Sequence, residues 1–77
     1  MRGEWKDRGF DEFAFCTEDD RAHAVVRRDR SDIFKDKPWV AWTYYTEGND
    51  RYSTVEEAQA RACDRLRRLL EATESLR

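Results

Sequence analysis

Residues 39–45, Trp-Val-Ala-Trp-Thr-Tyr-Tyr, constrain the fold of this chain more than any other segment. Side chains alternate across a β-strand, so Trp39 and Ala41 point to one face while Trp42 and Tyr44 point to the other. The strand is therefore apolar or aromatic on both faces, but the sequence contains only one strongly amphipathic helix to cover it. The pattern does not decide which tryptophan the helix covers. We assign Trp42 and Tyr44 to the open, partner-binding face.

The composition predicts one small domain with a thin core. Of the 77 residues, 42% are charged and 39% are hydrophobic, and short chains bury a smaller fraction of their surface. Aromatic residues, at 13%, partly compensate because each large ring buries about 150–250 Å². We expect a single domain over residues 10–77. Residues 1–9 are polar apart from Trp5 and are predicted to form a loose N-terminal arm.

Three segments have the period-two pattern of β-strands. In the first, Phe13 and Phe15 share one face, and Ala14 and Cys16 share the other. Pro38 opens the third strand, where a missing N–H is tolerated. The predicted strands cover residues 10–16, 21–28 and 39–45, with turns or loops at residues 17–20, 29–37 and 46–50.

The most regular pattern is a C-terminal amphipathic helix. Thr54 is a good N-cap, and Glu57 three residues later completes a capping box; Ser53 with Glu56 would serve nearly as well. Apolar positions then recur at steps of three or four residues, so the helix should be about 33 Å long and extend beyond strands of about 20 Å. These positions are Val55, Ala58, Ala62, Leu66, Leu69, Thr73 and Leu76. The predicted fold is α+β (β-β-β-α), a three-stranded antiparallel β-sheet packed on one C-terminal α-helix.

In that order of elements, the first turn and the turn before the helix meet at one end of the sheet, which should be acidic. The acids can simply be solvated turn residues, or favourable charges at the helix N-terminus. Alternatively, they act as a DNA mimic that docks into a basic groove, where complementary charge raises the association rate. The acidic candidates are Glu18, Asp19, Asp20, Glu47, Asp50, Glu56 and Glu57. The alternative basic site, at the opposite end, consists of Arg27, Arg28, Arg30 and Lys35.

The sequence lacks a catalytic, cofactor-binding or metal-binding motif. His23 lies in a strand where neither an orienting carboxylate nor a nucleophile can be placed beside it, so it is interpreted as a packed or exposed strand residue. Cys16 and Cys63, with one histidine in the chain, do not make a zinc site. We expect both cysteines to be reduced and buried; a redox pair joining strand and helix is the alternative. No enzymatic activity, cofactor or metal is predicted.

Charge and hydropathy restrict the expected partners. The formal net charge of -2 at pH 7 gives no overall attraction to nucleic acid or to anionic membranes. No apolar run approaches the roughly 20 residues that span a bilayer, and Met-Arg-Gly-Glu-Trp-Lys lacks the apolar core of a signal peptide. We expect a cytoplasmic protein without a membrane partner.

Two segments carry a resemblance to known proteins: Pro38-Trp39-Val40-Ala41-Trp42 and Tyr52-Ser53-Thr54-Val55-Glu56-Glu57-Ala58-Gln59-Ala60. Over residues 10–75 the pattern resembles small β-β-β-α proteins of phages and mobile elements. In size, acidity and lack of catalytic residues it is similar to anti-CRISPR proteins. The resemblance implies an inhibitor that binds a bacterial surveillance complex and blocks its DNA-binding groove, in the cytoplasm of the host bacterium. No functional residue is carried over from it.

The leading functional hypothesis is therefore a non-enzymatic, phage-type inhibitor that binds a protein partner through an acidic and aromatic surface. One alternative is a nucleic-acid-binding regulator that uses the sheet and Arg27, Arg28 and Arg30. Another is a homodimeric structural module that pairs two open sheet faces. The protein is accordingly expected to be a monomer or a homodimer.

Overall fold

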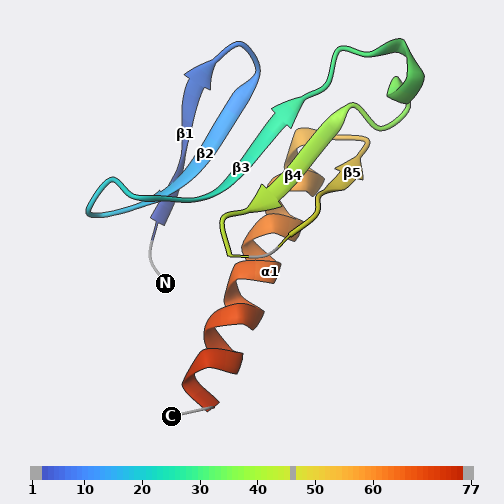
Figure 1. Ribbon diagram of the computed structural model, residues 1–77. Helices are drawn as coiled ribbons and strands as arrows, with labels where there is room; N and C mark the ends of the chain where they lie inside the picture. Colours follow the sequence, from blue (N-terminus) through green and yellow to red (C-terminus); the bar gives the residue numbers. More distant parts are fainter. Residues whose placement is uncertain (1–2, 46, 76–77) are drawn as a thin grey trace.

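The computed structural model describes residues 3–45 and 47–75, which form an α+β fold. In the described part of the chain, one antiparallel sheet carries a C-terminal helix on one face (Figure 1). Every strand pairs with its neighbours in sequence, in the order β1-β2-β3-β4-β5. The elements are β1 (Gly3–Gly9), β2 (Glu12–Thr17), β3 (Ala22–Arg28), the 3-10 helix η1 (Asp32–Phe34), β4 (Trp39–Thr43), β5 (Asp50–Tyr52) and α1 (Val55–Ser75).

The sheet has five strands, so the prediction of three strands was wrong. Residues 3–9 of the expected loose arm form the edge strand β1, while residues 1–2 lie outside the described part. Apart from half-buried Trp5, the strand is exposed on both faces. Its sequence therefore lacks the alternation of apolar and polar residues that would predict a strand. The other extra strand, β5, has only three residues. Its pairing with β4 creates it, and no local pattern of that length could predict it.

The first two strands are joined by a two-residue turn that the sequence pattern assigned to a strand. Gly9 and Glu12 are paired across it. Phe10 and Asp11 have φ angles of 54° and 58°, the left-handed conformation of a type I′ hairpin turn. The side chain of Asp7 accepts a hydrogen bond from the Gly9 N–H at 2.8 Å. The strand therefore begins at Glu12 and not at Phe10.

The C-terminal helix agrees with its sequence pattern. The Thr54 hydroxyl accepts a hydrogen bond from the Glu57 N–H at 3.2 Å, which confirms Thr54 as the cap. Small side chains on both surfaces let the helix approach the sheet closely. Trp39 packs against this core, so it is the tryptophan on the helix side. The buried residues between helix and sheet are Ala24, Val26, Ala41, Ala58, Ala62 and Leu66. Figure 1 shows the last turns of α1 extending beyond the sheet.

The sheet face opposite the helix has a small core of its own. Ala14, Cys16 and Val25 are at most 2% exposed there, and Trp42 packs against them. A register shift between Phe15 and Cys16 pairs Cys16 with Ala22 and takes His23 out of the regular ladder. The half-buried ring of Trp42 thus covers part of the sheet face opposite the helix. This face is therefore less exposed than the sequence of residues 39–45 suggested.

The two cysteines lie on opposite sides of the sheet and are both free. Cys16 belongs to the core on the open face, whereas Cys63 is on the helix that covers the other face. Burial raises the pKa of the half-buried Cys63 thiol. The alternative of a redox pair is therefore dropped.

Candidate functional site

The additional strand β5 reverses the chain once more and moves the start of the helix to the other end of the sheet. Tyr52 at the end of β5 pairs with Trp39 at the start of β4. We call the end formed by residues 18–21, 44–45 and 47–49 the turn pole. The other end, formed by residues 10–11 and 29–38, is the hairpin pole, and α1 begins beside it (Figure 1).

The expected acidic surface is therefore divided. Glu56 and Glu57 lie in the first turn of α1, at the hairpin pole. Asp50 is in β5, opposite Ala41, and its carboxylate is bound by Arg65 of the helix. Four of the seven predicted acidic residues remain together at the turn pole, all of them exposed: Glu18, Asp19, Asp20 and Glu47.

A chain of hydrogen bonds joins the two turns of the turn pole. His23, 7% exposed, bonds to the Thr17 hydroxyl through Nε2 at 3.1 Å and to the Tyr45 hydroxyl through Nδ1. Thr17 donates its hydroxyl proton to the Asp19 carboxylate. The Tyr44 N–H also donates to the His23 carbonyl at 3.1 Å. The acidic turn after β2 and the tyrosine-bearing turn after β4 are thus held against each other.

The direction of this chain follows from the donors available. A hydroxyl has one proton, and Thr17 gives its proton to Asp19, so Thr17 can only accept from His23. In the neutral ring, Nε2 therefore carries the proton, and Nδ1 accepts from the Tyr45 hydroxyl. The Thr17 hydrogen bond lowers the pKa of Asp19. All four groups have a consistent partner, which gives His23 a structural role that its sequence neighbourhood did not reveal.

Tyr44 and Tyr45 supply the aromatic part of the turn pole. Their side chains are 58% and 55% exposed. In the turn after β2, Asp20 forms an ion pair with Lys6 at 2.6 Å, which lowers the pKa of Asp20 and raises that of Lys6. Of the two aromatic residues predicted for the partner surface, Tyr44 lies here, whereas Trp42 belongs to the open-face core. Tyr45 was missed because residues 44–45 were read as part of a regular strand, with Tyr45 on the helix side.

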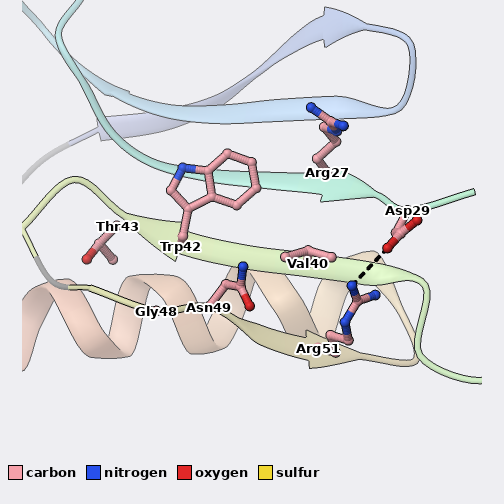
Figure 2. A pocket seen from close by; sticks show the side chains of 8 residues that line it. All are labelled: Arg27, Asp29, Val40, Trp42, Thr43, Gly48, Asn49 and Arg51. Atoms are coloured by element: carbon pink, nitrogen blue, oxygen red, sulfur yellow. Dashed lines mark hydrogen bonds and ion pairs between the residues drawn. The ribbon is translucent and has the colours of Figure 1, made fainter. Parts of the chain in front are cut away.

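An open groove of about 570 Å³ lies on the sheet face opposite the helix. In Figure 2, Arg27 projects from β3 and Arg51 from β5, with Val40 of β4 between them and the Trp42 ring farther along β4. Arg51 forms an ion pair with Asp29 at 2.8 Å, and its guanidinium carbon lies 3.7 Å from the centre of the Phe34 ring. Arg51 thereby fastens the loop of residues 29–38 to the sheet.

This Arg51–Asp29 clamp should make the loop sensitive to acid. The Ser31 N–H and Arg51 lower the pKa of the Asp29 carboxyl, so the ionised form stabilises the fold above about pH 4 and this contribution is lost as pH falls further. We expect Asp29→Asn to lower the urea midpoint at pH 7, and the difference from wild type to shrink at about pH 3. Exposed Asp36→Asn is the control. An unchanged difference at the two pH values would contradict the assignment.

The arginines predicted as the alternative basic site do come together at the hairpin pole. Arg27, Arg28 and Arg30 line a hollow of about 390 Å³ together with Arg8 and Phe10. Lys35 lies with Arg28 and Arg30 around a neighbouring hollow of about 310 Å³. Arg8 was missed because it fell in the expected loose arm.

The described residues offer neither a metal centre nor a membrane-crossing element. Within residues 3–45 and 47–75, no group of three or more His, Cys, Asp or Glu side chains could hold a metal ion. In the same part of the chain, no helix combines the length and apolar character needed to cross a membrane. No protein-family model, curated protein or solved structure matches this chain. Function is therefore inferred from the geometry of the two poles.

Proposed function

We propose that this protein is a non-enzymatic binding protein that uses its turn pole to dock on a basic surface of a bacterial protein complex. The observation that supports this most is the Tyr45–His23–Thr17–Asp19 chain of hydrogen bonds. It holds exposed carboxylates and exposed tyrosines in one surface. We further propose that occupying a nucleic-acid-binding groove makes the protein an inhibitor of the anti-CRISPR type, acting in the cytoplasm of the host bacterium.

The composition of the turn pole suits an interface. Tyrosine is enriched among interface anchors because it offers a large, rigid ring and a polar hydroxyl at low entropic cost. Tyr44 and Tyr45 are more than half exposed, and the turn of residues 18–20 lies beside them. Carboxylates at the rim favour a positively charged partner and increase the rate of encounter. A groove that binds nucleic acid is such a partner.

Charge reversal at the turn pole should abolish inhibition while leaving the fold intact. Glu18 and Glu47 are exposed and lie outside the hydrogen-bond chain and ion pairs of this pole, so Glu18→Lys with Glu47→Lys changes charge with little effect on stability. In a bacterium whose CRISPR–Cas system targets a phage, the wild-type protein should restore plaque formation at least tenfold. The double variant should not. Direct capture of the purified surveillance complex should follow the same order.

The matched control is Asp36→Lys with Glu56→Lys, which changes the net charge equally at exposed positions of the hairpin pole. It should inhibit as well as the wild type. Equal plaque restoration by both double variants would show that the turn pole is not the binding surface. Failure of the wild-type protein to restore plaques or to capture the complex would contradict the inhibitor proposal for that system.

A further inference from the structure

Phe10 has a strained backbone conformation, and packing of its side chain within the protein does not offset this strain. It occupies the first position of the hairpin turn with a φ of 54°, where asparagine or glycine is favoured and a bulky residue is strained. Its side chain is 92% exposed, so burial contributes almost nothing in return. An exposed aromatic ring at a strained turn position indicates a role outside the fold.

Four arginines line a hollow together with Phe10. Arg8 comes from β1, Arg27 and Arg28 come from the end of β3, and Arg30 follows in the loop; all line one hollow with Phe10. The side chains of Arg28 and Arg30 are 53% and 71% exposed. A planar guanidinium can bind a phosphate through two parallel hydrogen bonds.

Two carboxylates beside this hollow, Asp11 and Asp29, are paired with arginines. Asp11 sits between Arg28 and Arg30, with nitrogen–oxygen distances of 3.9 Å and 3.4 Å. Asp29 is taken by Arg51 at 2.8 Å. Glu12 also lines the hollow. The long, exposed contacts of Asp11 are weak, so a phosphate can replace this carboxylate. In the absence of a phosphate, Asp11 holds Arg28 and Arg30 near the hairpin turn.

We infer that the hairpin pole binds single-stranded nucleic acid, with one base stacked on Phe10 and adjacent phosphates on Arg28 and Arg30. Stacking on a protein ring requires an unpaired base, and the tip offers one ring and a few arginines instead of the long basic surface that a duplex needs. This site is distinct from the turn pole. It places the nucleic acid at the opposite end of the sheet from the proposed protein partner.

Fluorescence anisotropy with labelled 12-mers of oligo(dT) and oligo(U), and with a duplex of the same length, tests the inference at about 50 and 200 mM salt. We expect both single strands to bind more tightly than the duplex, with weaker binding at higher salt. A preference between the two single strands shows whether DNA or RNA is favoured. Equal or tighter binding of the duplex, or no binding of either single strand at 50 mM salt, overturns the inference.

Phe10→Asn separates binding from folding. Because asparagine suits the left-handed turn, the melting temperature should rise by several degrees. Loss of the stacked ring should nevertheless weaken single-strand binding about tenfold. If this variant binds the single strands like the wild type, Phe10 is not a stacking residue and the inference fails.

Two charge variants test the phosphate contacts. Arg28→Ala with Arg30→Ala should weaken single-strand binding and reduce its salt dependence. Asp11→Asn should tighten binding, because it releases both arginines from their carboxylate. An acidic control, oligo-glutamate, should not compete with oligo(dT) at equal charge. Effective competition would show a general anion site or an acidic peptide site and overturn the assignment to nucleic acid.

Discussion

Trp42→Ala is expected to destabilise the fold by about 3 kcal/mol, because Trp42 covers a buried core. Its ring packs against Ala14, Cys16 and Val25, which are at most 2% exposed on a sheet face that has no helix. Removing the ring would expose these side chains to water, and the lost burial of apolar surface would not be replaced by another contact. Urea unfolding measured by circular dichroism gives the free energy of unfolding.

Tyr44→Ala is the matched control, since Tyr44 follows on the same side of the chain but is 58% exposed. Its cost should be below about 0.5 kcal/mol. A second readout is the thiol of Cys16, 1% exposed in the wild type. In a Cys63→Ala background, Trp42→Ala should accelerate labelling of Cys16. A small destabilisation with unchanged labelling would show that Trp42 does not cover this core.

Leu66→Ala should have a comparable effect from the other side of the sheet, about 3 kcal/mol. Leu66 is 3% exposed and belongs to the core between helix and sheet. Its neighbours there are largely alanines, which have no side-chain freedom with which to fill a cavity. Against a total stability of about 5–10 kcal/mol for a chain of this size, the melting temperature should fall by about 15 °C.

Ile33→Ala provides the comparison for Leu66→Ala, because it removes a branched side chain of the same volume that is 83% exposed. It should leave the melting temperature nearly unchanged. Thermal unfolding followed by circular dichroism compares the two variants directly. A similar loss in both would indicate that Leu66 is not part of the core that holds the helix on the sheet.

Local patterns predicted the parts of the fold that depend on neighbouring residues. The cap at Thr54 and the buried positions Ala58, Ala62 and Leu66 followed from side-chain chemistry and the helical period. The division of Phe13 and Phe15 from Ala14 and Cys16 followed from strand alternation. In each case the residues that define the pattern lie within one turn or one strand of each other.

The candidate surfaces depended more on distant contacts. The sequence pattern placed Glu56 and Glu57 at the same end of the sheet as Glu18. That placement was wrong because the strand β5 lies between β4 and the helix. Phe10 was read as the beginning of a strand because aromatic residues favour strands, although Gly9 before it and Asp11 after it are turn residues. The partnership of His23 with Tyr45 spans 22 positions, and no local pattern contains it.

The sequence by itself determined that a strand with apolar residues on both faces begins near Trp39 and that a capped helix covers one of these faces. Alternation and the helical period act over a few residues and need no knowledge of the rest of the chain. Only the tertiary structure decided that Trp39 lies under the helix, that Trp42 covers the opposite core, and which charged turns meet. The physical reason is β5, because its three residues become a strand only by pairing with β4. This additional reversal of the chain places the start of the helix at the opposite end of the sheet from the one predicted.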